Sequence, residues 1–113
     1  MTIEDIGKIR VVTPETAQID VMNANEFGTK LMQALEGSSS CVLDLCNVVF
    51  LDSSALGRIV IALRNCKMQG RHFIICGATE AVALLFKMVR LAQIAEILPD
   101  RDAALARLKG EAV

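Results

Sequence analysis

A carboxylate and two neighbouring hydroxyls stand where the chain changes from a strand pattern to a helix pattern. Asp52, Ser53 and Ser54 follow the apolar run 48–51, and a helical pattern continues from them to about Met68. In parallel α/β sheets, sites lie beyond the carboxyl ends of the strands, so this junction is a place for chemistry. The same residues also suit a structural role, because Asp or Ser before a helix accepts hydrogen bonds from its free N–H groups.

A hydroxyl acts as a nucleophile only when a base lies beside it, and this chain offers little for that role. His72 is the single histidine, and the pattern places it at the start of the next strand, at the opposite end of a parallel sheet from Ser53. A phosphate-binding loop needs several glycines and a lysine, and Gly57 alone does not meet that pattern. We therefore disfavour a serine-dependent enzyme and expect neither a catalytic residue nor a cofactor.

The composition of the 113 residues excludes further classes of function. Twelve basic and thirteen acidic residues give a net charge of −1, and four Phe without Trp or Tyr offer few stacking surfaces, so we expect no nucleic-acid partner. No secretion signal and no apolar run of about 20 residues is seen, which predicts a cytoplasmic protein without membrane insertion. One histidine and four cysteines without a Cys-x-x-Cys spacing argue against a metal site, and we interpret the cysteines as reduced thiols, mostly in the core: Cys41, Cys46, Cys66 and Cys76.

The elements that must position these residues alternate between strands and helices. Two short strands are predicted first, over 9–12 and 17–20, followed by a helix that Asn23 caps together with Glu26 and that ends before Gly37. The alternation implies one α/β domain over residues 1–113, with about four helices and a mixed but mostly parallel sheet. The later elements are expected at 41–45 (strand), 48–51 (strand), 53–68 (helix), 71–76 (strand), 80–89 (helix), 96–98 (strand) and 100–109 (helix).

In this setting the hexapeptide 52–57, Asp-Ser-Ser-Ala-Leu-Gly, resembles the signature of STAS domains, the fold of sulfate transporters and anti-sigma factor antagonists. Ala55 stands where the motif usually has glycine, and Val89-Arg90 stands where related sequences often have Ser-Gly at a helix end. The resemblance extends from about residue 6 to residue 108 and implies a single STAS-like domain. It also includes Ile19-Asp20, Leu43-Asp44-Leu45, Val82, Leu85, Phe86 and Met88.

The resemblance implies a non-enzymatic regulatory protein, an anti-sigma factor antagonist that acts by partner switching. Its partner would be an anti-sigma factor that is also a serine kinase of the GHKL type and phosphorylates Ser53, with Ser54 as second choice. A PP2C-type phosphatase would reverse the reaction, and Asp52, Gly57 and Asp20 would support the site. The alternative is a STAS-type cytosolic subunit of an ABC lipid-transport system, which would bind its ATPase constitutively.

The charge that phosphorylation adds at Ser53 should affect partner binding and the fold differently. The phosphate adds about −1.5 to −2 charges beside Asp52. The N-terminus of the following helix stabilises this charge within the monomer, so we expect the fold to survive. A docked partner would have to remove water from the phosphate next to a carboxylate, at a cost on the order of several kcal/mol. Phosphorylation is therefore predicted to abolish binding without unfolding the protein.

The helix after the motif predicts a docking surface. At 3.6 residues per turn its outer face is centred on Ile61, which we interpret as part of the interface unless a neighbouring helix covers it. Asp20 either contacts the partner or positions Ser53, and Asp44 is expected to bind nearby backbone rather than a ligand. We expect a monomer or a weak dimer. The inward residues are Leu56, Ile59, Leu63 and Cys66; Gly57 faces outward; the candidate partner-binding residues are Asp20, Asn23, Ser54, Arg58, Ile61, Arg64 and Met68.

Overall fold

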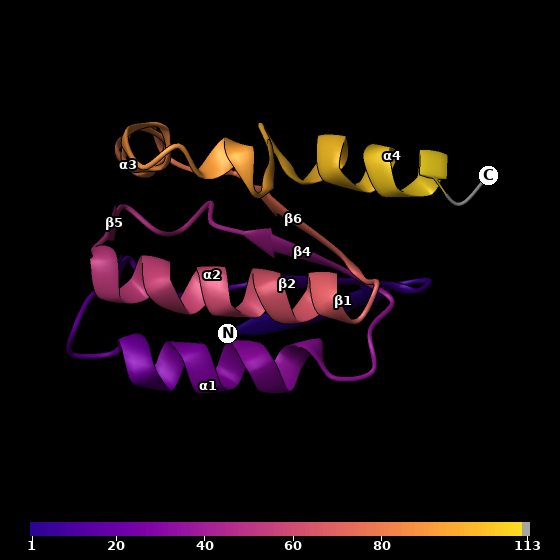
Figure 1. Ribbon diagram of the computed structural model, residues 1–113, viewed down its shortest axis with the longest axis horizontal. Coiled ribbons are helices and arrows are strands. Elements are labelled where there is room, and N and C mark those ends of the chain that lie inside the picture. Colours follow the sequence, from indigo (N-terminus) through magenta and orange to yellow (C-terminus); the bar gives the residue numbers. More distant parts are fainter. Residues whose placement is uncertain (112–113) are drawn as a thin grey trace.

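The computed structural model describes residues 1–111 as one α/β domain (Figure 1). After the first three strands, helices and strands alternate as the sequence predicts, except that β4 and β5 follow one another without a helix between them. The elements are β1 Thr2–Ile6, β2 Ile9–Thr13, β3 Gln18–Ile19, α1 Ala24–Leu35, β4 Ser40–Asp44, β5 Phe50–Leu51, α2 Ser53–Met68, β6 His72–Cys76, α3 Glu80–Met88, the 3-10 turn η1 Leu91–Gln93, β7 Glu96–Leu98 and α4 Arg101–Glu111.

The main sheet has five strands in the order β1-β2-β4-β6-β7, and β1 alone runs antiparallel to its neighbour. The predicted mixed, mostly parallel sheet is therefore confirmed. Strand β1 is not expected from the sequence, because Thr2–Ile6 forms an exposed edge strand with no buried apolar face. The antiparallel pair consequently joins β1 to β2. The second predicted strand shortens to β3, which pairs in parallel with β5 in a separate two-stranded sheet.

Helices cover both faces of the main sheet. Helices α1 and α2 lie side by side on one face, and α3 and α4 lie on the opposite side (Figure 1). Successive side chains of a strand point to opposite faces, so a buried central strand contributes to two cores. On β4, Cys41 and Leu43 belong to the core that includes α1 and α2, whereas Val42 packs with Ala104 and Leu108 of α4.

Asp44 ends the central strand β4 and is almost fully buried. Its Oδ1 accepts a hydrogen bond from the main-chain N–H of Cys46 at 3.1 Å, which confirms the expected backbone contact. Its Oδ2 also lies 3.4 Å from Nε of Arg101, so the first residue of α4 neutralises the buried carboxylate. This ion pair joins α4 to the end of the sheet.

The end of α3 lies where the sequence departs from the STAS pattern. The helix stops at Met88, and Arg90 then adopts a left-handed backbone with φ of 56°. Among residues 1–111, Arg90 is the one residue other than glycine with a positive φ. Glycine adopts this conformation without strain, and in this chain an arginine adopts it instead.

Candidate functional site

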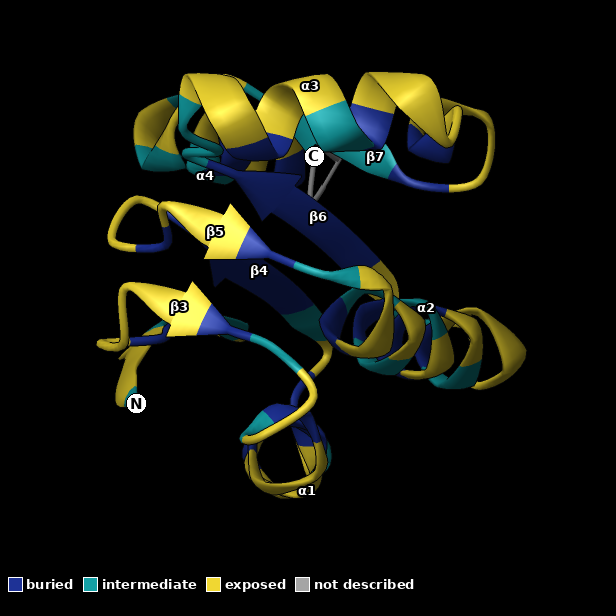
Figure 2. Ribbon diagram, turned by 90° about the vertical axis from the view of Figure 1, so that its left-hand side faces the viewer, coloured by how far each residue is buried: buried dark blue, intermediate teal, exposed yellow. Residues whose placement is uncertain are grey.

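The short β3–β5 sheet brings two distant loops together beyond the carboxyl ends of the main strands. Gln18 pairs with Phe50 and Ile19 pairs with Leu51, so the loop before α1 lies beside the start of α2. Figure 2 looks onto this end of the molecule and shows the exposed residues of β3 and β5 next to one another. The predicted neighbourhood of Asp20 and the Asp-Ser-Ser motif follows from this pairing.

Asp52 caps α2 and also holds the neighbouring loop. Its Oδ1 accepts from the main-chain N–H of Ala55, and its Oδ2 accepts from that of Val21, each at 3.0 Å. Ala55 is fully buried, so the methyl group at the usual glycine position packs into the core. The structural N-cap role of Asp52 is therefore confirmed. The second hydrogen bond gives Asp52 a further structural role, because it holds the loop of Val21 beside the start of α2.

Ser53 and Ser54 form the first turn of α2 and are both exposed. Among residues 1–111, neither hydroxyl has a hydrogen-bond partner. The cap is formed by Asp52, so both hydroxyls are accessible to a modifying enzyme. A phosphate on Ser53 would lie at the positive end of the α2 dipole and next to the Asp52 carboxylate.

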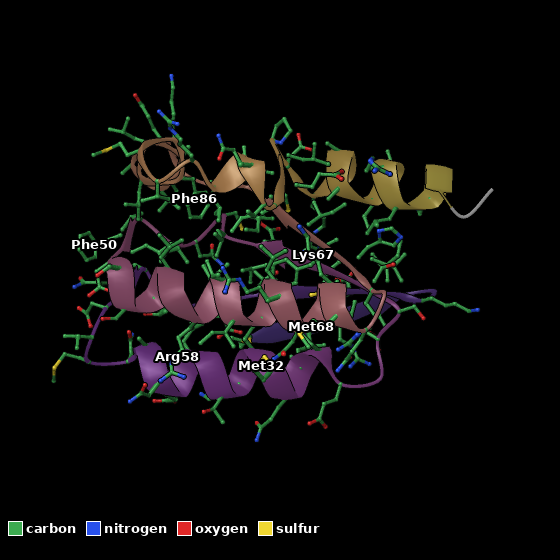
Figure 3. All side chains as sticks on the ribbon, in the orientation of Figure 1. Met32, Phe50, Arg58, Lys67, Met68 and Phe86 are labelled. Carbon is green, nitrogen blue, oxygen red and sulfur yellow. The ribbon has the colours of Figure 1, made fainter. Side chains whose placement is uncertain are left out.

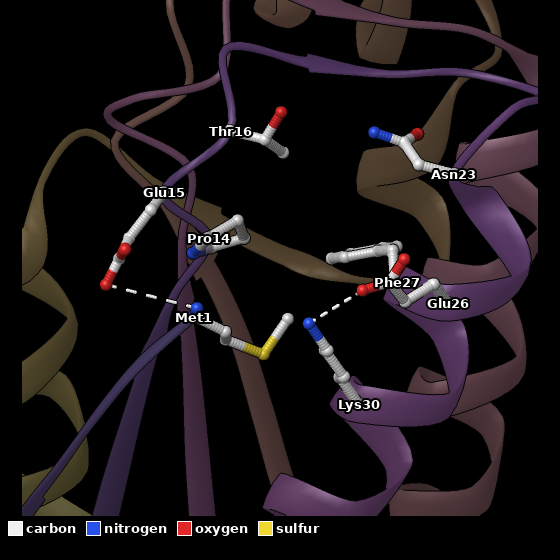
Figure 4. Close-up of a pocket in the computed structure, with 8 residues that line it drawn as sticks. All are labelled: Met1, Pro14, Glu15, Thr16, Asn23, Glu26, Phe27 and Lys30. Carbon is white, nitrogen blue, oxygen red and sulfur yellow. Dashed lines mark ion pairs between the residues drawn. The ribbon is translucent and has the colours of Figure 1, made fainter.

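Asp20 and Asn23 organise the loop before α1 rather than capping that helix. Asp20 accepts from the main-chain N–H of Met22 at 2.9 Å, and Asn23 Oδ1 accepts from the main-chain N–H of Asp20 at 2.8 Å. The expected capping box is wrong, because the Asn23 side chain does not bind the helix and Glu26 pairs with Lys30 at 2.8 Å. This ion pair lowers the pKa of Glu26. Glu26 and Lys30 are among the residues that line a small pocket of about 150 Å³ (Figure 4).

Exposed apolar side chains lie on the two loops that Asp52 joins, and no pattern in the sequence predicts them. Val21 and Met22 are 70% and 88% exposed, and Val49 and Phe50 are about half exposed. We call these four residues the strand-end surface. In the two-residue strand β5, Leu51 is buried, so the side chain of Phe50 must point to the opposite, exposed face. This alternation is the only sequence feature that could have predicted the exposure of Phe50. Isolated exposed apolar residues are ordinary, but four on the two paired loops that lead to accessible serines suggest a contact region.

The outer face of α2 is as predicted, but it extends away from Ser53. Ser54, Gly57, Ile61, Arg64 and Met68 are all exposed, and Ile59, Leu63 and Cys66 are buried; Leu56 is partly buried against the core. At 1.5 Å per residue, Ile61 lies about 12 Å and Met68 about 22 Å along the helix from Ser53. Figure 3 places Phe50 at the Ser53 end of α2 and Met68 at the other end.

Arg58 contacts α1. Its guanidinium donates to Oδ1 of Asn25, and its aliphatic carbons lie over Gly28, where a Cβ would be 2.7 Å from Arg58 Cδ. Arg58 therefore joins the second turn of α2 to the N-terminal half of α1, close to the loop of Asp20 and to the serines. The remaining exposed charge on the outer face of α2 near Ile61 is Arg64.

Other candidate chemistry lies away from this end or has no suitable geometry. His72 is exposed at the first residue of β6, at the opposite end of the parallel strands from Ser53, as predicted. Among the described residues, no group of His, Cys, Asp and Glu is arranged to hold a metal ion. All four cysteines are free, and Cys46 is exposed while the other three are buried. Burial raises the pKa of Cys41 and Cys66, and burial together with the nearby Asp44 carboxylate raises that of Cys76 to about 12.

The fold and the site together define a small α/β domain with an accessible serine at the start of a central helix. Residues 1–104 match the family model described as STAS domain. The chain belongs to the STAS domain family. None of the helices in the described part of the chain combines the length and apolarity that a membrane-spanning helix needs.

Solved structures with the same fold have low sequence identity to this chain. A putative anti-sigma factor antagonist from Thermotoga maritima is 21% identical with a TM-score of 0.87, over 96% of this chain and 93% of that one. An anti-sigma factor antagonist from Mycobacterium paratuberculosis is 20% identical with a TM-score of 0.87, over 96% and 92% of the two chains. The Bacillus cell fate determinant SpoIIAA in its phosphorylated form is 14% identical with a TM-score of 0.70, over 95% and 97%.

Proposed function

We propose that this protein is a non-enzymatic regulatory switch of the anti-sigma factor antagonist type. In the unphosphorylated state it binds an anti-sigma factor that is also a GHKL-type serine kinase, and phosphorylation of Ser53 releases it. A PP2C-type phosphatase restores the binding form. The observation that carries the proposal is the exposed Ser53 hydroxyl, which has no partner among residues 1–111 and follows the capping carboxylate of Asp52.

The strand-end surface explains why a single phosphate would act as a switch. A partner that covers Val21, Met22 and Phe50 also covers Ser53, because the Asp52–Val21 hydrogen bond holds the two loops together. In the unphosphorylated state the covered groups are apolar side chains and a neutral hydroxyl. With the phosphate present, the partner must remove water from about two negative charges beside Asp52, and among residues 1–111 no cation forms an ion pair with Asp52 or Asp20.

The test begins with candidate kinases encoded beside the gene of this protein. Each is incubated with the protein and ATP, and the phosphate is located by mass spectrometry. We expect it on Ser53; Ser54 is the second choice, and phosphate only at other residues would refute the assignment. Binding is then compared for wild type, Ser53→Ala and Ser53→Glu, with Ser39→Glu as a control at an exposed serine before β4. Ser53→Ala should bind like wild type and Ser53→Glu should not.

The same experiment separates the switch from a constitutive subunit of a transporter. Capture of a transporter ATPase that is equally strong for wild type and Ser53→Glu would contradict the proposed switch and support the lipid-transport alternative. Circular dichroism and thermal unfolding of each variant check that a loss of binding does not reflect a loss of fold.

A further inference from the structure

A groove between α3, η1 and β7 is separate from the residues around Ser53. Its volume is about 460 Å³, which lies within the range of about 300–1,000 Å³ typical of small-molecule sites. Phe86 is buried beneath it and Ile97 is partly exposed along it, while Ala83 and Ala92 form apolar walls. The groove therefore offers an apolar surface that can hold a hydrocarbon or aromatic body.

The charges that line the groove are all positive. Lys87 and Arg90 are exposed at its margin, and Gln93 is the remaining polar side chain. No acidic residue lines the groove, and neither cation forms an ion pair within residues 1–111. An anion with an apolar body complements this combination, whereas a cation or a strongly polar solute does not.

Arg90 occupies its place at a cost in backbone energy. Its φ of 56° is left-handed, which costs a residue other than glycine about 1–2 kcal/mol. The turn after α3 would form more readily with glycine, but glycine would remove a positive charge from the groove. Strain of this kind is a reason to look for a function of the side chain that bears it.

We propose that the groove binds a small organic carboxylate with an apolar body. The body would lie against Phe86 and Ile97, and the carboxylate would accept hydrogen bonds from Lys87 and Arg90. This inference does not depend on phosphorylation of Ser53, because Phe86 and the groove residues take no part in the hydrogen bonds that organise the serine loop.

Decanoate is a suitable probe, and its binding to the full chain can be followed by amide chemical shifts in NMR. We expect saturable shifts at Ala83, Lys87, Gln93 and Ile97. Decanol has the same body without the charge, acetate has the charge without the body, and decyltrimethylammonium has the opposite charge. All three should bind at least about tenfold more weakly than decanoate, which corresponds to about 1.4 kcal/mol or more.

Variants distinguish a built site from general adhesion of a fatty anion. Lys87→Gln with Arg90→Gln should weaken decanoate binding at least about tenfold and leave the left-handed turn in place. Ala83→Trp should block binding by filling the groove. Arg64→Gln is the matched control and should leave binding unchanged, since Arg64 is an exposed cation on α2 that forms no ion pair within residues 1–111. Equal binding of decanol, an unchanged affinity in the double variant, or no saturable shift up to millimolar decanoate would each overturn the proposal.

Discussion

The carboxylate of Asp52 accepts a hydrogen bond from the main-chain N–H of Val21 at 3.0 Å, across 31 positions of the chain. Its other oxygen caps α2 through Ala55. One side chain therefore fixes the first turn that bears Ser53 and also the loop that presents Val21 and Met22. The accessible serine and half of the strand-end surface are held in one arrangement by the residue that precedes the serine.

Replacement of Asp52 tests this double role. Asp52→Ala removes the helix cap and leaves the Val21 N–H without its acceptor, so the free energy of unfolding should fall by about 1–2 kcal/mol in urea titrations. Asp52→Asn is the matched variant, because asparagine caps a helix about as well as aspartate but has a single acceptor oxygen. It should recover most of the stability. Amide hydrogen exchange at Val21 should be faster in Asp52→Ala, and an unchanged rate would show that Asp52 does not hold the loop.

A second prediction separates two surfaces that a partner could use. If the strand-end surface is the centre of the interface, Phe50→Ala should weaken partner binding by about tenfold or more, because central aromatic residues contribute most to such interfaces. Ile61→Glu tests the outer face of α2, about 12 Å further along the helix.

Ile94→Ala is the control for both variants, since Ile94 is 40% exposed after η1 and lies near the far end of α2, where Lys67 donates to its carbonyl. Calorimetric titration against the kinase gives the affinities. A Phe50→Ala variant that binds like wild type would exclude the strand-end surface, and an unaffected Ile61→Glu variant would exclude the outer face of α2.

The sequence predicts the elements that bury a regular apolar pattern and misses those fixed by contacts between distant residues. Helix α2 and its inward positions Ile59 and Leu63 follow from spacing alone, and so does the end of the helix before Gly70. The Asp52–Val21 hydrogen bond depends on the pairing of two-residue strands, which are too short to give a pattern. Asn23 illustrates the same limit, because its side chain binds the backbone of Asp20 instead of the helix that follows it.

The buried cysteines predict sensitivity to alkali. In the folded protein the pKa of Cys76 is raised to about 12, and those of Cys41 and Cys66 are also raised, chiefly by burial. Below about pH 8 the thiols are protonated in both the folded and the unfolded chain, so their contribution to stability is constant. Above about pH 8 the unfolded chain loses these protons first, and once its thiols are mostly ionised each should lower the free energy of unfolding by about 1 kcal/mol per pH unit.

Urea titrations between pH 8 and pH 11 in a reducing buffer measure this slope, and the absence of tyrosine removes one competing ionisation. Cys76→Ala should make the slope shallower by roughly a quarter, because one of the four thiols whose pKa is raised in the folded protein is lost. Val42→Ala serves as the control: it removes carbons from the same core as Cys76 and should lower stability without changing the slope. Equal slopes for wild type and Cys76→Ala would contradict the assignment.

The left-handed arginine after α3 predicts a substitution that stabilises the protein. Arg90→Gly relieves the strained φ of 56°, and the gain exceeds the entropy that glycine loses on folding, so the free energy of unfolding should rise by about 0.5–1 kcal/mol. Arg90→Ala removes the same charge but keeps the strain, so it should give no such gain. Thermal unfolding of the two variants separates backbone strain from charge. If both variants were equally stabilised, the cause would be the loss of the positive charge beside Lys87 rather than the conformation of the turn.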